Sequence, residues 1–166
     1  MARISVFGIG YVGVVSAACL ARDGHQVIAV DVEPGKVEAI NAGLSPIVEN
    51  GLDALIAQVV GDGKLSATDD VQHAIDNSDV SFIAVGTPSA PDGSVGLTYV
   101  ETACRNIGAA MAKKQGYHSV VIRSTSVETA GGLKAARKRR TMRSKMRWSS
   151  PLRPLGLPWP VGMIAK

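Results

Sequence analysis

The stretch Gly8-Ile9-Gly10-Tyr11-Val12-Gly13 decides the fold, because it joins an apolar run to a segment without helix breakers. The run before it contains Ile4, Val6 and Phe7 and is typical of a short strand, whereas residues 14–22 predict a helix. A second strand is predicted at residues 26–31 and ends at Asp31, 18 residues beyond Gly13. This order and spacing are those of a strand-helix-strand unit that binds a dinucleotide.

Each glycine of the stretch has a separate expected purpose. Gly8 permits the tight turn out of the strand, Gly10 lacks the Cβ that would block a pyrophosphate, and Gly13 allows the helix to pack closely on the sheet. The first-turn N–H groups of that helix have no partner within the helix and favour an anion. Asp31 can accept hydrogen bonds from the adenosine ribose, and its charge would repel a 2′-phosphate. The predicted cofactor is therefore NAD rather than NADP.

The same segment allows a rival interpretation. Residues 4–21 carry no charge and lie between Arg3 and Arg22, which could describe a signal peptide or a short membrane span. Ser5 and the three glycines interrupt an apolar helix, and neither alternative explains a second strand that ends in Asp31. We therefore expect no membrane association.

Strands and helices are predicted to alternate as far as residue 122. Further helices are expected at residues 33–41, 52–60, 69–76 and 97–114, and further strands at 65–67, 80–85 and 119–122. The helix at 69–76 is expected to be capped by Thr68 or Asp69. This alternation predicts an α/β fold, a Rossmann-like doubly wound parallel sheet that is incomplete after its fifth strand.

Ligands of such a sheet bind beyond the carboxyl ends of its strands. This rule selects Thr87 in the Gly86-Thr87-Pro88 turn, Thr125 in Arg123-Ser124-Thr125, and Lys36, which follows Asp31 by five residues. The three histidines show no metal-like spacing, so no metal site is predicted. Cys19 and Cys104 give neither a metal pattern nor a disulfide framework, which indicates a reduced, cytoplasmic setting.

Composition changes abruptly near residue 126. Residues 1–128 hold 8 Lys/Arg and all 14 Asp/Glu, whereas residues 129–166 hold 10 Lys/Arg and no acidic residue. The last part is also rich in proline and lacks a helical or strand period. We therefore expect an NAD-binding domain at 1–125 and a basic, Pro-rich tail at 126–166 that is disordered or translated out of frame.

Residues 2–125 resemble the UDP-glucose/GDP-mannose 6-dehydrogenase family. The stretches that carry the resemblance are residues 4–13, Asp31 with Lys36, Ser45-Pro46-Ile47-Val48-Glu49, Gly51-Leu52, Ser78-Asp79-Val80, Val85-Gly86-Thr87-Pro88 and Arg123-Ser124-Thr125. The Ser45–Glu49 stretch, and Ser89 followed by Tyr99-Val100-Glu101-Thr102, look more like the GDP-mannose branch.

The resemblance implies an oxidoreductase of polysaccharide biosynthesis that oxidises the C6 alcohol of a sugar nucleotide to a carboxylate with two NAD. By resemblance, the NAD site would contain Gly8, Gly10, Tyr11, Val12, Gly13, Asp31, Lys36, Thr87 and Thr125. Thr125 would also support the reacting centre.

The resemblance stops after Thr125. The family continues with a Leu-Pro-Gly-Thr pattern, whereas this chain reads Ser126-Val127-Glu128-Thr129. The family's Gly-Gly-x-Cys-x-Pro-Lys-Asp nucleophile motif, its dimer helix and its sugar-nucleotide domain have no counterpart here. A frameshift near codon 126 would account for this, and we expect a truncated chain without turnover by itself.

A second interpretation is a non-catalytic nucleotide-binding module whose basic tail binds nucleic acid or another acidic surface. Runs such as Arg137-Lys138-Arg139-Arg140 are ordinarily solvated segments, so nucleic acid is the less favoured partner. In either interpretation, residues 120–122 form an apolar strand at the sheet edge that would favour association between chains.

Overall fold

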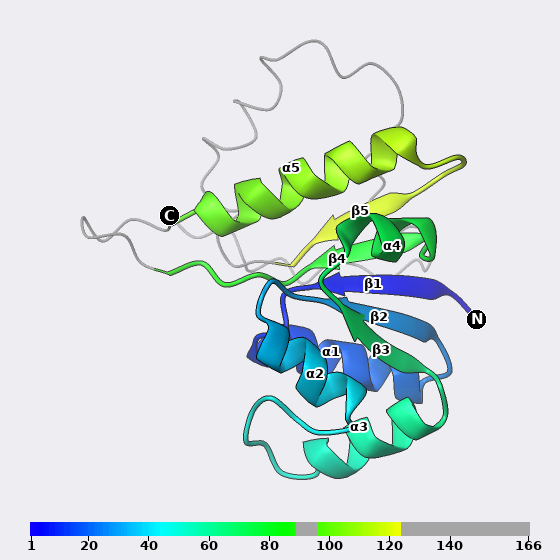
Figure 1. The fold of residues 1–166 in the computed structure, drawn as a ribbon, viewed down its shortest axis with the longest axis vertical. Helices are drawn as coiled ribbons and strands as arrows, with labels where there is room; N and C mark the ends of the chain where they lie inside the picture. The colour runs from blue at the N-terminus through cyan, green and yellow to red at the C-terminus, as the bar shows by residue number, and fades with distance from the viewer. Residues whose placement is uncertain (89–95, 124–166) are drawn as a thin grey trace, which may run out of the picture.

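The computed structural model describes residues 1–88 and 96–123, and the structural statements below refer to these residues. The elements, shown in Figure 1, are β1 (Arg3–Phe7), α1 (Tyr11–Arg22), β2 (Gln26–Val30), α2 (Pro34–Asn41), α3 (Leu52–Gly61), β3 (Leu65–Thr68), α4 (Val71–Asp76), β4 (Val80–Ile83), α5 (Thr98–Lys113) and β5 (Ser119–Ile122). The predicted tail, together with Ser124 and Thr125, lies outside the described residues.

The five strands form one parallel sheet in the order β3-β2-β1-β4-β5. β1 lies at the centre, where Val6 aligns with Ala29 of β2 on one side and with Phe82 of β4 on the other. The chain first builds outward from β1 through β2 to β3 and then returns to place β4 and β5 on the other side. This reversal of direction beside β1 confirms the predicted Rossmann-like, doubly wound fold.

Helices cover both faces of the sheet, as Figure 1 shows, with α1, α2 and α3 on one face and α4 and α5 on the other. Successive side chains of β1 point to opposite faces of the sheet. Ile4 and Val6 pack in the core beneath α1 and α3, and Phe7 packs in the core beneath α4 and α5. Small residues bring α1 close to the sheet, since Ala17, Ala18 and Ala21 are almost completely buried.

Several predicted boundaries differ from the observed ones. α1 begins at Tyr11, directly after the N-cap residue Gly10, rather than at residue 14. The strand predicted at 80–85 ends at Ile83, so the chain leaves the sheet before the Gly86-Thr87-Pro88 turn. β2 ends at Val30, which places Asp31 just beyond the carboxyl end of its strand.

The predicted cap of α4 was wrong. The side chain of Asp70 accepts a hydrogen bond from His73 N at 3.0 Å and is the N-cap, whereas Thr68 Oγ1 accepts from Asp70 N at 3.0 Å. Thr68 thus turns the chain out of β3, and Asp70 starts the helix. Three neighbouring residues could each act as a cap by type, and only the backbone path selects one of them.

The charge-free segment at residues 4–21 is divided between β1, a turn and α1, so it does not form one continuous apolar helix. Within residues 1–88 and 96–123, none of the helices has both the length and the apolar character needed to cross a membrane.

Asn41 covers the outer edge of β3. Its side-chain amide accepts from Ala67 N at 2.8 Å and donates to Ala67 O at 2.9 Å. Since β3 is a terminal strand of the described sheet, these Ala67 groups have no neighbouring strand among the described residues to pair with. The last residue of α2 therefore occupies the place of a neighbouring strand and protects this edge from pairing with another chain.

Candidate functional site

Most of the predicted site residues lie at the carboxyl ends of the strands. The turn at residues 8–13 follows β1, Asp31 follows β2, and the half-buried Thr87 follows β4. Arg123 follows β5 and donates its backbone N–H to Ile83 O at 2.9 Å. Thr125 lies outside the described residues, so its position stays a prediction.

Gly8 and Gly13 allow backbone segments to approach each other closely at the turn. Gly8 has a positive φ of 99°, and a Cβ at this position would meet Ala84 O and the Val85 backbone at 2.9 Å. A Cβ on Gly13 would lie 1.8 Å from Gly8 O, so α1 can start here only without a side chain. These two glycines hold the N-terminus of α1 against the ends of β1 and β4.

Gly10 differs, because a Cβ built on it meets nothing within 4 Å. Its backbone conformation (φ −88°) is accessible to other residues as well. Packing within the protein therefore does not require glycine at this position, which leaves room for a ligand above the turn. Within the described part of the chain, no side chain caps the N-terminus of α1, and its first turn carries no acidic residue. The first-turn N–H groups of an uncapped helix suit an anion.

Asp31 fixes the glycine-rich turn from the neighbouring strand. One carboxylate oxygen accepts from Ile9 N at 2.6 Å and the other accepts from Glu33 N at 3.1 Å. Its side chain is only 11% exposed, yet it stands at the edge where β2 ends. Each oxygen keeps lone pairs for a second donor, so a carboxylate held this way can still accept hydrogen bonds from ligand hydroxyls.

Lys36 lies beside Asp31 and pairs with acidic side chains. Its Nζ is 2.9 Å from Glu33 Oε2 and 3.9 Å from Asp31 Oδ2. The hydrogen bond from Lys36 to Glu33 raises the pKa of the ammonium, although partial burial opposes this. Lys36 therefore stays positively charged and offsets part of the negative charge of the two carboxylates next to the turn.

The loop at residues 43–51 approaches the start of α1. Tyr11 Oη donates to Glu49 Oε2 at 2.8 Å, and this hydrogen bond raises the pKa of the phenol. The loop is itself held by Asp53, which accepts from Ser45 N at 3.0 Å. Tyr11 and Val12 remain exposed in the first turn of the helix. Sequence reasoning assigned no role to Glu49, because no local pattern predicts a contact across 38 residues.

The fold and this edge together define a class of protein. A central strand leads through a Gly-x-Gly-x-x-Gly turn to an uncapped helix N-terminus, and an acidic residue ends the next strand. Gly10 leaves open space above the turn, next to the largely buried side chain of Asp31. These features fit a pyrophosphate and a ribose diol, so the domain is of the dinucleotide-binding class.

Comparisons with known proteins specify this class further. Residues 2–148 match the model of the UDP-glucose/GDP-mannose dehydrogenase family, NAD binding domain. The chain is 55% identical to the GDP-mannose 6-dehydrogenase of Pseudomonas aeruginosa over 123 residues, which are 74% of this chain and 28% of that protein. It is 48% identical to the UDP-glucose 6-dehydrogenase of Rhizobium meliloti over 124 residues, again 74% of this chain and 28% of the relative.

Solved structures agree with these matches. A ternary complex of the P. aeruginosa GDP-mannose dehydrogenase superposes with a TM-score of 0.73 at 55% identity, over 74% of this chain and 28% of that one. A UDP-glucose dehydrogenase from Pyrobaculum islandicum gives a TM-score of 0.73 at 46% identity, over 75% and 29% of the two chains. The chain therefore belongs to the UDP-glucose/GDP-mannose dehydrogenase family, where it corresponds to the NAD-binding domain and takes NAD as its cofactor.

Proposed function

We propose that this chain supplies the NAD site of a sugar-nucleotide 6-dehydrogenase, with GDP-mannose as the favoured substrate class. The observation that carries the NAD site of this proposal is the 2.6 Å hydrogen bond from Ile9 N to Asp31, which joins the glycine-rich turn to the acidic end of β2. Residues 8–13 would hold the pyrophosphate, Asp31 the adenosine ribose, and Lys36, Thr87 and Thr125 the remaining edge of the cofactor. NAD supplies the hydride acceptor when it is bound.

The substrate proposal rests on the relatives. Two pseudomonad proteins at 55% and 52% identity are GDP-mannose 6-dehydrogenases, and the match at 48% from R. meliloti is a UDP-glucose 6-dehydrogenase. The Ser45–Glu49 and Tyr99–Thr102 stretches support the same branch. GDP-mannose oxidation to GDP-mannuronate, polysaccharide biosynthesis and a cytoplasmic location are accordingly part of the proposal, and UDP-glucose is the alternative substrate.

Turnover requires a nucleophilic cysteine in the mechanism implied by the family. Cys19 and Cys104 lie within α1 and α5, and burial raises the pKa of the Cys104 thiol, which disfavours a thiolate. The chain spans 28% of the length of the curated relatives named above. We therefore propose that this polypeptide binds NAD and forms no NADH from GDP-mannose or UDP-glucose by itself, and NADH production in that assay would contradict the proposal.

Cofactor selectivity tests the NAD site directly. We expect the protein to bind NAD at least about tenfold more tightly than NADP in calorimetric titrations, which corresponds to about 1.4 kcal/mol. Asp31→Asn keeps an acceptor for Ile9 N and removes the charge that repels a 2′-phosphate, so this variant should lose most of that discrimination. Asp23→Asn is the matched control, because Asp23 is an exposed carboxylate beyond the other end of α1.

The control variant should bind both cofactors as the unaltered protein does. Equal affinity of the unaltered protein for NAD and NADP, or an unchanged ratio in Asp31→Asn, would show that Asp31 does not select the cofactor.

A further inference from the structure

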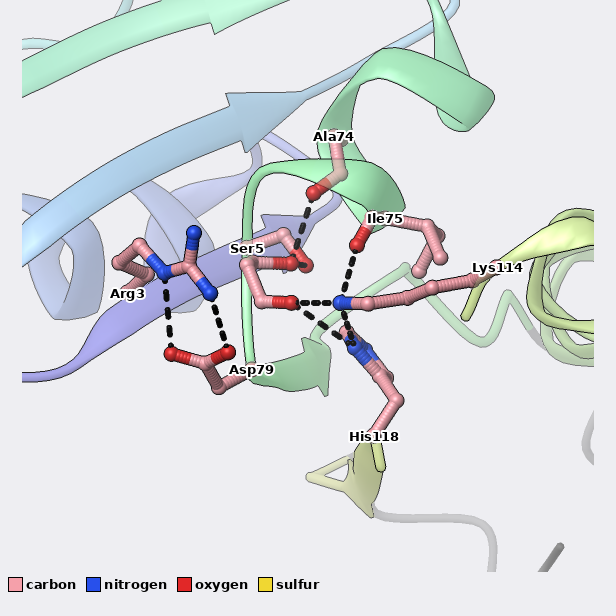
Figure 2. A network of polar contacts seen from close by, with 8 residues as sticks. Arg3, Ser5, Ala74, Ile75, Asp79, Lys114 and His118 are labelled. Atoms are coloured by element: carbon pink, nitrogen blue, oxygen red, sulfur yellow. Dashed lines mark hydrogen bonds and ion pairs between the residues drawn. The ribbon is translucent and has the colours of Figure 1, made fainter. Parts of the chain in front are cut away.

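A network of buried polar side chains lies at the amino ends of β1, β4 and β5, away from the carboxyl ends that carry the cofactor site (Figure 2). Ser5, Ser78 and Ser81 are completely buried, and His118 is 5% exposed. Sequence reasoning assigned no role to His118. Buried polar groups are costly unless they are paired, so the pairing in this network determines its protonation states.

One side of the imidazole leads into a row of serine hydroxyls. His118 Nε2 lies 2.7 Å from Ser81 Oγ, and Ser81 Oγ lies 2.6 Å from Ser5 Oγ. Ser78 Oγ is 3.0 Å from Ser5 Oγ and donates to Ala74 O at 2.7 Å. The row thus connects β5 through β4 and β1 to α4.

The other side of the imidazole meets Lys114, which directly follows α5. Lys114 Nζ donates to Ile75 O in α4 at 2.7 Å, donates to Ser78 O as well, and lies 3.1 Å from His118 Nδ1. These three contacts, drawn in Figure 2, match the three N–H groups of an ammonium. Lys114 therefore fastens the end of α5 to the end of α4 and to the start of β4.

The pairing requires a neutral His118. An ammonium has no acceptor, so the contact between Lys114 and His118 is a hydrogen bond only when Nδ1 carries a lone pair. Nε2 then carries the hydrogen and donates it to Ser81 Oγ. Nδ1 also lies 3.0 Å from Ser78 O, the same carbonyl that Lys114 uses. Protonation, which puts a second hydrogen on the ring at Nδ1, would turn this contact into a hydrogen bond and leave Lys114 facing a second cation.

We propose that Lys114 and His118 form an acid-sensitive latch, which holds α5 and β5 to α4 and β4 while His118 is neutral and opens when His118 is protonated. The protonated imidazole takes Ser78 O from Lys114, and repulsion between the two cations drives the ammonium out of the network. When the Lys114 ammonium leaves the network, Ile75 O at the end of α4 also loses its hydrogen-bond donor. The expected result is local opening of β5, which has a strand partner on one side only in the described sheet.

The charges around the latch favour the neutral imidazole. Burial lowers the pKa of His118 below its ordinary value of 6.5, and the Lys114 cation lowers it further, whereas Ser78 O and Asp79 oppose these effects. Burial also lowers the pKa of Lys114, with Arg3 acting in the same direction and Asp79 and Asp76 opposing. The Asp79 carboxylate is itself paired with Arg3 at 2.7 Å, so it offers His118 little compensation.

The direction of the pH effect follows from proton uptake. Below pH 6.5 the unfolded chain protonates His118 while the folded chain does not, until the lowered pKa of the folded state is reached. Stability is therefore complete above pH 6.5 and falls as the pH drops through that window. The unfolding equilibrium constant should rise by up to about tenfold for each pH unit within it.

The test combines an NMR titration of His118 with hydrogen exchange of the β5 amides in the full 166-residue chain. We expect the His118 ring to titrate below pH 6.5 and the Ser119–Ile122 amides to lose protection in the same pH range. Lys114→Met should move the His118 titration upward, towards the ordinary value. Lys113→Met is the matched control, since this neighbouring lysine is exposed, and it should leave the titration unchanged.

Urea unfolding at a series of pH values provides a second readout. His118→Gln should remove the pH dependence within the window, whereas the exposed His73→Gln should keep it. If His118→Gln does not fold, the His118 titrations in the unaltered protein and in Lys114→Met still test the proposal. The proposal is overturned if His118 titrates at or above 6.5, if Lys114→Met leaves its titration unchanged, or if the β5 amides stay protected through it.

Discussion

At the scale of single residues, Gly10 and Gly13 show how one motif combines two different requirements. Gly13 has no room for a Cβ because Gly8 O would lie 1.8 Å away, whereas a Cβ on Gly10 would meet nothing within 4 Å. The requirement at Gly13 thus comes from the fold itself. At Gly10 the fold imposes no such requirement, so the proposed NAD site is the reason that we expect for glycine there, and the two requirements can be separated by substitution.

Gly13→Ala should destabilise the domain by about 2 kcal/mol or more, since the clash is with backbone and no side chain can move aside. Gly10→Ala should cost about 1 kcal/mol or less and should weaken NAD binding by at least about tenfold. Urea unfolding and calorimetric NAD titrations check both effects. The distinction fails if Gly10→Ala unfolds the protein or binds NAD normally.

Residue identity was enough to predict the place of Asp31 but not its partners. The count from Gly13 put the carboxylate at the end of the second strand, because strand and helix lengths are nearly constant in such units. Residue spacing could not predict the hydrogen bond from Ile9 N, since this bond depends on how closely β1 and β2 bring their loops together. The same holds for Tyr11 and Glu49, which meet only because the loop at 43–51 reaches the first residue of α1.

At the scale of elements, the type and order of every helix and strand in the described residues followed from periodicity, and the ends did not. α4 illustrates the reason. Thr68, Asp69 and Asp70 are all good caps, and the structure uses Thr68 for the turn and Asp70 for the helix. Propensity identifies the candidates, but the direction in which the chain leaves β3 selects among them.

Asp70→Ala should therefore destabilise the protein by about 1 kcal/mol, because His73 N loses its acceptor at the start of α4. Asp69→Ala is the matched control: it removes an adjacent carboxylate that is exposed and does not cap the helix. It should change the free energy of unfolding by no more than about 0.5 kcal/mol. Equal losses in the two variants, measured by urea unfolding, would show that general charge and not the cap matters.

At the scale of the whole molecule, the two sheet edges differ. Asn41 pairs with the outer edge of β3, whereas β5 is the last strand of the described sheet, and its residues 120–122 are apolar and half-buried. Within residues 1–88 and 96–123, β5 has no cover equivalent to Asn41, and an apolar terminal strand of this kind invites pairing between chains. The predicted consequence is a marginally stable domain that associates with itself.

We expect the apparent mass from light scattering to rise with protein concentration, and saturating NAD to stabilise the folded state. At 100 times its dissociation constant the cofactor would add about 2.7 kcal/mol. A strictly monomeric protein with a sharp transition at high temperature, in the absence of NAD, would contradict the expected association through β5.

The amino-acid sequence by itself determined the fold class, the order of elements, the glycine-rich turn and the position of the acidic residue at the end of the second strand. These are local properties, set by side-chain periodicity, by the space that glycine leaves and by short spacings along the chain. Only the tertiary structure brought Lys114 and His118 together with Ser78, and Asn41 onto Ala67. Such contacts join residues 26 to 40 positions apart, and their geometry depends on how helices pack on the finished sheet, which no local pattern encodes.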